Sequence, residues 1–447
     1  MYNYVKEGRR MKPRRIIVLL LAAITVFCLS GCDAFSVDTD ALLTPPELTG
    51  DMYPISKALA KSVKGDYQLK YPSLGDRRSA IILEDINGDG VSEAFAFYST
   101  SNDEMTNMHI NIISAVGKEY KSVADMSVVA GGVEQIVFCD FDGDGTKEIV
   151  VGWEVYGSSE KQICVYSLDG DETAQLLSEK YTGFICCDLF ENGKNQLLVQ
   201  QLNTSELKNT ALLYSATESG LKKAASCVLD PEVKTVSAPV LSKLSSGKTA
   251  VYIDEIKGAG AVTEVLFCID GELKNPLLNT ENKIENIRTL RSASIGSRDI
   301  DGDGVLDIPV ATNLPNAAGS DELLFYTNWC AFDGENLLTK QITVLNTIDG
   351  YYLKIPENLA GRLAVLKDTE NHRRVFYYYD AQFDTVGDRL ATILTVSKKK
   401  WDKEDFNRAD MFELDRNDEN VFVGSVNLAA RQAISEQTLE EMFNKEQ

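Results

Sequence analysis

The chain has 447 residues, of which 44% are hydrophobic, enough apolar material to form one or more packed cores. It carries 67 acidic and 45 basic residues, which gives a formal net charge of −22. Because so acidic a surface repels phosphate groups, we expect no nucleic-acid partner.

The first residues have the pattern of a secretory signal. A basic stretch (9–15) precedes an apolar run (16–29) that is too short to span a membrane comfortably. The next residues, Leu29-Ser30-Gly31-Cys32, resemble the lipobox of bacterial lipoproteins, in which the cysteine is acylated once the signal is removed. The resemblance implies a signal peptide over 1–31 and a lipid on Cys32 that anchors the chain to the cell membrane, outside the cytoplasm. The alternative is an ordinary cleaved signal with a chance cysteine.

Three nine-residue segments share oxygen-bearing side chains at positions 1, 3, 5 and 9 and a glycine at position 6. Oxygen ligands suit a hard cation of Ca²⁺ size, and glycine tolerates the sharp turn at position 6. We expect the carbonyl of position 7 to complete each set. The predicted ligands are Asp85, Asn87, Asp89, Val91 and Glu93; Asp140, Asp142, Asp144, Thr146 and Glu148; and Asp299, Asp301, Asp303, Val305 and Asp307.

These segments allow two other interpretations. An EF-hand needs a bidentate glutamate at position 12 and helices on both sides, whereas position 12 is Ala96, Val151 or Val310, each within a β-rich apolar run. The segments are therefore predicted to join strands. A metal-free turn is the second alternative, because aspartate and glycine favour turns without any ion.

The spacing of the turn glycines predicts a repeat. Gaps of 55, 48, 54 and 57 residues separate Gly90, Gly145, Gly193, Gly247 and Gly304. A period near 50 with four strands per unit is typical of a β-propeller. In the second unit we expect these strands at 134–140, 148–155, 162–167 and 174–180. The third and fourth units keep the glycine without the ligands, so we expect no metal there.

The loops and their spacing resemble the FG-GAP or VCBS repeat family, whose β-propeller blades carry Asp-x-Asp-x-Asp-Gly-x-x-Asp loops. The resemblance covers roughly residues 75–345. It implies calcium-stabilised blades and extracytoplasmic recognition, and it implies no single activity, since related blades occur in both receptors and enzymes. Five units are visible and larger members have seven blades, so the blade number is left between five and seven.

The period stops near residue 345. We therefore expect a lipidated tether over 32–50, a propeller over 51–345 that folds without the rest, and a small α+β domain over 346–447. In the last domain Ser435 is expected to cap a final amphipathic helix. The alternative is a sixth blade, because Gly361 follows Gly304 by 57 residues. The alternating run 66–71 is expected to pair with the last blade and close the propeller.

The cysteines and histidines suggest no catalytic or zinc site. The seven cysteines that follow Cys32 lie mostly in apolar strand runs, so we expect buried thiols rather than disulfides. The only two histidines, His109 and His372, offer little for zinc or for a Ser-His relay.

Two classes of function remain for this mainly β chain. The first is a membrane-anchored extracytoplasmic lipoprotein whose calcium-stabilised propeller binds a protein or glycan partner. The alternative is an extracytoplasmic hydrolase or lyase that acts on polysaccharide and is framed by the propeller. Since the sequence shows no nucleophile elbow, zinc triad or phosphate loop, we predict a binding protein without catalytic residues.

Overall fold

The computed structural model describes residues 52–63, 65–100, 107–117, 119–281, 283–292, 295–318, 322–403 and 407–445. The expected signal peptide, Cys32 and the tether up to residue 50 lie outside these ranges. The chain divides into two compact units, 1–57 and 58–447, and α3 (Met52–Ser62) crosses from one to the other. No helix among the described residues is long and apolar enough to cross a bilayer.

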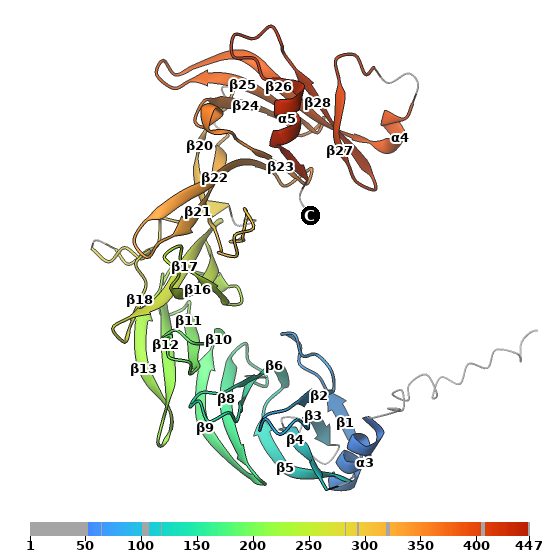
Figure 1. Cartoon of the computed structure of the whole chain (residues 1–447), viewed down its shortest axis with the longest axis vertical. Helices are drawn as coiled ribbons and strands as arrows, with labels where there is room; N and C mark the ends of the chain where they lie inside the picture. Colours follow the sequence, from blue (N-terminus) through green and yellow to red (C-terminus); the bar gives the residue numbers. More distant parts are fainter. Residues whose placement is uncertain are drawn as a thin grey trace, which may run out of the picture. The chain divides into compact units, whose positions relative to one another are not determined.

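The second unit is mainly β, as predicted, and its described strands form six antiparallel sheets that follow one another in chain order (Figure 1). Sheet 1 consists of β1 (Tyr67–Lys70), β2 (Ile81–Glu84), β3 (Glu93–Thr100), β4 (Asn107–Val116) and β5 (Glu119–Val129). Sheet 2 consists of β6 (Gly132–Cys139), β7 (Glu148–Glu154), β8 (Lys161–Asp169) and β9 (Glu172–Tyr181). Sheet 3 consists of β10 (Gly183–Cys187), β11 (Gln196–Asn203), β12 (Lys208–Thr217) and β13 (Gly220–Val228).

The remaining sheets are larger. Sheet 4 consists of β14 (Thr235–Val236), β15 (Val240–Lys243), β16 (Thr249–Lys257), β17 (Gly260–Ile269), β18 (Glu272–Lys274) and β19 (Arg291–Ser292). Sheet 5 consists of β20 (Ile308–Leu314), β21 (Leu324–Phe332), β22 (Leu337–Asn346), β23 (Tyr351–Lys354) and β29 (Phe443–Lys445). Sheet 6 consists of β24 (Leu363–Asp368), β25 (Arg373–Asp380), β26 (Thr385–Ser397), β27 (Phe412–Arg416) and β28 (Asn420–Val426). Three short helical segments are η1 (Glu357–Leu359), α4 (Lys398–Trp401) and α5 (Glu436–Met442).

In sheets 2 and 3 the second strand is apolar on both faces because a neighbouring sheet packs against each face. In β7, Val151 and Trp153 belong to the core shared with sheet 1, whereas Val150 belongs to the core shared with sheet 3. The ring of Trp153 meets that of Phe97 edge to face, with 5.7 Å between their centroids. Truncation of one such buried aromatic to alanine typically costs about 3–5 kcal/mol. The interfaces between neighbouring sheets therefore contain a large share of the apolar core.

Sheet 5 takes strands from both sides of residue 345, where a domain boundary was expected. β23 follows β22 through a tight turn and pairs with it, with Asn346 opposite Tyr351, and the final strand β29 then pairs with β23. Sheets 5 and 6 also share one apolar cluster, which contains Tyr351 and Phe422. The structure differs from the predicted boundary because the β22–β23 hairpin continues the antiparallel sheet beyond the last acidic loop.

Two local expectations have clear outcomes. The expected cap is confirmed, because Ser435 accepts a hydrogen bond from the backbone N–H of Thr438 at 3.0 Å, and Leu439 is buried in the middle of α5. The expected partner of the run 66–71 is wrong. β1 lies beside β3 of sheet 1, in line with β2, and Tyr67 faces Thr100. β3 is long enough to pair with both short strands, so β1 finds its partner locally.

The described cysteines form no disulfide and are buried or half-buried, as predicted. They lie on the strands or directly beside them, where the thiol packs as a small apolar group. These cysteines are Cys139, Cys164, Cys186, Cys187, Cys227, Cys268 and Cys330.

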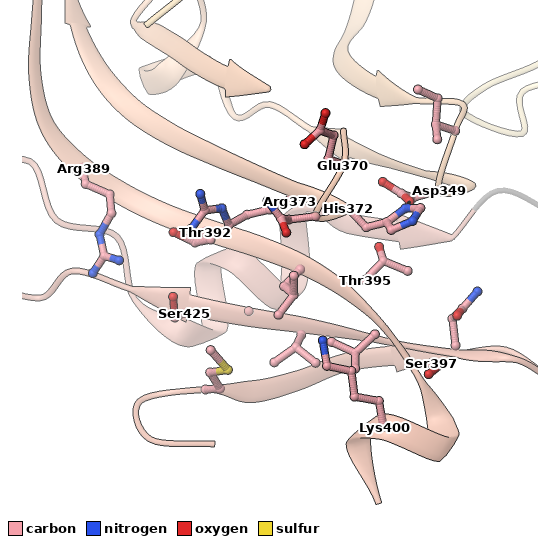
Figure 2. A pocket seen from close by; sticks show the side chains of 18 residues that line it. Asp349, Glu370, His372, Arg373, Arg389, Thr392, Thr395, Ser397, Lys400 and Ser425 are labelled. Carbon is pink, nitrogen blue, oxygen red and sulfur yellow. Dashed lines mark hydrogen bonds and ion pairs between the residues drawn. The ribbon is translucent and has the colours of Figure 1, made fainter. Parts of the chain in front are cut away.

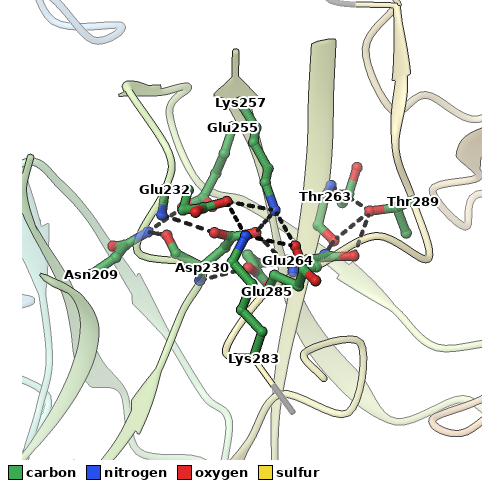
Figure 3. A network of polar contacts seen from close by, with 11 residues as sticks. Asn209, Asp230, Glu232, Glu255, Lys257, Thr263, Glu264, Lys283, Glu285 and Thr289 are labelled. Carbon is green, nitrogen blue, oxygen red and sulfur yellow. Dashed lines mark hydrogen bonds and ion pairs between the residues drawn. The ribbon is translucent and has the colours of Figure 1, made fainter. Parts of the chain in front are cut away.

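A buried polar network joins sheets 3 and 4 (Figure 3). Glu255 accepts a hydrogen bond from Asn209 at 3.1 Å, and Glu264 accepts one from the backbone N–H of Asp230 at 3.0 Å. Lys257 contacts the Asp230 carboxylate at 2.7 Å, and Lys283 pairs with Glu232 at 2.8 Å. Burial raises the pKa of Glu264 to about 7 and that of Glu255 well above its usual value, and the neighbouring carboxylates add to both shifts.

We predict that Glu264→Gln makes the chain more stable than the wild type at pH 8 and not at pH 5. A folded-state pKa of about 7, above the usual 4.5, means that the wild type loses stability as the pH rises from about 4.5 through about 7. A neutral glutamine avoids this loss, so the variant should gain on the order of 2 kcal/mol over this range. Urea unfolding at both pH values measures the gain. Glu218→Gln, on an exposed turn of sheet 3, is the control. An equal difference from the wild type at pH 5 and pH 8 would contradict the prediction.

Candidate functional site

The three acidic loops lie where strands meet. The first (85–92) joins β2 to β3 and the second (140–147) joins β6 to β7. The third (299–306) leads into β20 and is closed by a bridge between Arg298 and Asp307. The first two loops thus connect strands, as predicted, whereas the third is preceded by the single bridge residue Arg298, and none is flanked by the helices of an EF-hand.

Each loop is shaped by its first aspartate. In the second loop the Asp140 carboxylate accepts hydrogen bonds from the backbone N–H groups of Gly143 at 2.6 Å and Gly145 at 3.0 Å. Gly145 has a φ of +93°, a conformation that favours glycine. Asp85 and Asp299 accept the equivalent pairs of bonds in the other loops. The turn is therefore organised by the protein's own groups.

Position 9 places a carboxylate under each loop. Glu148 is buried and accepts a hydrogen bond from the backbone N–H of Phe141 at 3.0 Å. Burial raises its pKa to about 7, and the charges of Asp142 and Asp140 add to this shift. Burial likewise raises the pKa of Asp307 to about 6. A cation held by these loops would favour the ionised carboxylates.

Two of the loops bring three carboxylates to a common point. The ligand atoms of Asp140, Asp142 and Asp144 lie within 4.8 Å of one another, as do those of Asp299, Asp301 and Asp307. Hard carboxylate oxygens at this separation fit Ca²⁺. Glu148 and Asp303 are outside these groups, and the described carboxylates of the first loop, Asp85, Asp89 and Glu93, form no such group. In that loop Asn87 donates a hydrogen bond to Asp89 at 3.3 Å. The carbonyl ligands Val91, Thr146 and Val305 stay predictions.

The third repeat forms the same turn from a different set of residues. Asp188 accepts from the N–H of Gly193 at 2.8 Å, and Gln196 replaces the buried carboxylate by accepting from the N–H of Leu189, also at 2.8 Å. Phe190 stands at position 3, where it offers no ligand. The turn therefore forms without the full set of acidic ligands, so its shape does not depend on metal binding.

Consecutive turns are hydrogen-bonded to one another along one edge of the sheets. The donor is in each case the backbone N–H of position 8, and the acceptor is an oxygen of the preceding turn. The pairs are Lys147 with the Ile86 carbonyl (2.7 Å), Asn195 with the Asp140 carbonyl (3.3 Å), Thr249 with the Glu191 carboxylate (2.7 Å) and Leu306 with the Ser242 hydroxyl (3.1 Å). A cation in one loop would therefore stiffen a turn that also holds the next sheet.

Sheet 6 carries a polar pocket of about 830 Å³, which the sequence did not predict (Figure 2). Its walls come from β26, β28, α4 and the turns 347–350 and 369–372. We call it the sheet 6 pocket. The face that lines it also carries a small apolar cluster with Val396, Val421 and Val423.

His372 is held in a defined orientation at this pocket. Its Nδ1 lies 2.6 Å from Oδ1 of Asp349, whose other oxygen accepts a hydrogen bond from Asn346 at 2.7 Å. Arg374 in turn donates to Asn346 at 3.2 Å, and both of these side chains are buried. The backbone of His372 is left-handed, with a φ of +51°, an unusual conformation that is often found at functional sites.

The sequence pattern predicted no role for His372. Its partner Asp349 is 23 residues away, in a different turn, and no local pattern marks the pair. In the neutral tautomer that donates Nδ1–H to this carboxylate, Nε2 is a hydrogen-bond acceptor. The one signal available was the rarity of histidine in the chain.

Comparisons with known proteins assign no family. No protein-family model matches the chain, and no curated protein matches it in sequence. Among solved structures, a rhamnogalacturonan lyase from Bacillus licheniformis is 12% identical over 72% of this chain and 69% of that one, with a TM-score of 0.32. The exotype rhamnogalacturonan lyase YesX is 10% identical over 73% and 84% of the two chains, with a TM-score of 0.31. A periplasmic gluconolactonase from Pseudomonas aeruginosa is 12% identical over 71% and 86%, with a TM-score of 0.29. Likeness this weak carries no argument about the activity of this chain.

Proposed function

We propose that the chain is a membrane-anchored, extracytoplasmic binding protein in which Ca²⁺ stiffens a series of propeller-like β-sheets. The observation that carries this proposal is the second acidic loop. There, three carboxylates converge within 4.8 Å on a turn already shaped by hydrogen bonds to Gly143 and Gly145. A pre-shaped group of hard oxygen donors is suited to bind Ca²⁺ at little conformational cost.

The position of the loops supports a structural role for the ion. The N–H of Asn195, in the next turn, bonds to the carbonyl of Asp140, so a ligand residue of the second loop also holds sheet 3. Binding of Ca²⁺ would stabilise the interface between sheets 2 and 3. It would also relieve the repulsion among the carboxylates of the empty loop. The sheets would then present a rigid surface to a protein or glycan partner.

The proposed anchor rests on Leu29-Ser30-Gly31-Cys32 after the apolar run. A diacylated or triacylated cysteine holds a protein on a bilayer stably, whereas a single chain does so only marginally. Lipid anchoring outside the cytoplasm also agrees with weak calcium sites, because extracellular modules typically bind with dissociation constants of about 10⁻⁴ to 10⁻³ M.

A second candidate is an extracytoplasmic hydrolase or lyase that acts on polysaccharide. His372 favours it, since a histidine oriented by a carboxylate is a common general base. Among the described side chains, however, only Asp349 hydrogen-bonds to His372, and no nucleophile or acid partner joins the pair. Binding therefore remains the main proposal.

We predict that Ca²⁺ raises the unfolding temperature of the chain. At 1 mM Ca²⁺, a site with a dissociation constant of about 10⁻⁴ M stabilises the folded state by about 1.4 kcal/mol, and three such sites by about 4 kcal/mol. Calorimetry of the full chain in detergent, with Ca²⁺ or with EGTA, should show a difference of several degrees. The double variant Asp140→Asn/Asp144→Asn should show a smaller difference between Ca²⁺ and EGTA. The control Asp171→Asn, on an exposed turn, should show the same difference as the wild type. An identical midpoint in Ca²⁺ and EGTA would rule out the calcium proposal.

We further predict that Cys32→Ala releases the protein from the membrane. Without the thiol no lipid can be attached, so the variant should neither incorporate labelled fatty acid nor sediment with membranes. Cys28→Ala, inside the apolar run, is the matched control and should behave like the wild type. Continued labelling and sedimentation of the Cys32 variant would show that the anchor lies elsewhere.

A further inference from the structure

Two buried carboxylates between sheets 3 and 4 have no cation beside them. Asp230, Glu255 and Glu264 are all fully buried. Lys257 contacts Asp230 at 2.7 Å, and among the described residues no cation forms an ion pair with Glu255 or Glu264. When ionised, these two side chains place two uncompensated negative charges in the interior. Buried charges in proteins are normally paired or bound to a metal.

The two carboxylates share one face of sheet 4. Across β16 and β17, Glu255 is opposite Val262 and Glu264 is opposite Ile253, so the glutamates are diagonal neighbours. This face packs against sheet 3, because Ile253 belongs to the same core as Leu198 of β11. Figure 3 shows both side chains within one group of polar contacts. Diagonal neighbours are about 7–8 Å apart at their Cα atoms, so two long side chains can hold one ion between them.

The same cluster contains buried oxygen atoms that accept no hydrogen bond. They are Oε2 of Glu255, Oε1 of Gln200 and Oδ1 of Asn275. Gln200 is 1% exposed and its Nε2 donates to the other oxygen of Glu255, so its side chain is directed into the cluster. Asn275 contacts Glu264. Among the described side chains, Oδ1 of Asn111 is the only other amide or carboxylate oxygen in this condition. Unpaired acceptors concentrated around negative charge call for a positively charged ligand.

We propose that one Ca²⁺ ion binds between Glu255 and Glu264, with Oε1 of Gln200 and Oδ1 of Asn275 as further ligands. These residues offer four carboxylate oxygens and two amide oxygens, at the lower end of the roughly six to eight that Ca²⁺ takes. The charge of Ca²⁺ matches the two unpaired carboxylates. Mg²⁺ suits the site less well, because it keeps several waters in a regular octahedron and this cluster lies in the interior.

This site is separate from the acidic loops and from the proposed binding function, since it uses no loop residue. An ion enclosed by buried residues can leave only when sheets 3 and 4 separate locally, whereas an ion in an exposed loop exchanges freely. Protons can relieve the same charge when no ion is bound. The pH effect predicted above for Glu264→Gln therefore belongs to the ion-free chain.

The test is the calcium content of the full chain after gel filtration. The protein is purified in detergent with about 2 mM CaCl₂, above the dissociation constants typical of extracellular sites, and then passed through calcium-free buffer. Plasma mass spectrometry measures the calcium that remains. The variants are Glu255→Gln and Gln200→Met, each shown to be folded by circular dichroism. The matched control is Gln201→Met, the next residue of β11, which is bonded to the carbonyl of Lys180 instead.

The proposal expects about one Ca²⁺ to remain per wild-type chain. Glu255→Gln should retain at least about tenfold less calcium, and Gln200→Met, which loses one neutral ligand, should also retain less than the wild type. Gln201→Met and the loop variant Asp140→Asn/Asp144→Asn should match the wild type. If Glu255→Gln does not fold, Gln200→Met decides the question.

A wild-type chain that retains no calcium would overturn the proposal, as would full retention in either folded variant of the cluster. Calcium that is lost only in the loop variant would also overturn it, because the tightly held ion would then lie in the second acidic loop. The calcium proposal for the loops is judged separately, by the unfolding temperature in Ca²⁺ and EGTA of the loop variant.

Discussion

The structure depends on one constraint: a sheet with two apolar faces needs a neighbour on each side. In β7 and in β11, alternate residues belong to different cores. Val199 packs towards sheet 2 and Leu198 towards sheet 4, just as Val150 and Val151 point to opposite sides of sheet 2. No such sheet can bury its own surface, so folding stability is distributed over the joints between sheets, as in other repeat proteins.

The acidic loops contribute to these interfaces between sheets. Each loop lies next to a strand of its sheet and accepts or donates a hydrogen bond across to a neighbouring turn, as Asp140 does with Asn195. An ion bound there would tighten the same contacts that the apolar layers already hold together. The sheet 6 pocket follows from the same constraint in a different way. It lies on the face opposite the large cluster shared with sheet 5. Among the described residues, a small apolar group and α4 pack on this face, and polar side chains line the pocket.

Local features were predictable from the sequence. The acidic loops, the strands on either side of them and the cap at Ser435 each depend on residues a few positions apart, and the expected strand 148–155 corresponds to β7 (Glu148–Glu154). Nonlocal pairings were not predictable. Nothing near Phe443 signals that the chain returns to pair with β23 of sheet 5, about 90 residues earlier, and nothing near His372 points to Asp349. Such contacts are selected by the packing of the whole unit, which single-sequence patterns do not encode.

A chain that ends at Leu345 tests whether neighbouring sheets stabilise one another. This truncation removes sheet 6 together with β23 and β29, which are adjacent strands at one end of sheet 5, and it removes most of the apolar cluster that packs around Tyr326. Native-state hydrogen exchange of the truncated and full-length chains should show that amides of β20, β21 and β22 lose protection, while those of β7 and β8 in sheet 2 keep theirs. Full protection of β20–β22 in the truncated chain would contradict the claim and show that residues 346–447 are a separate domain.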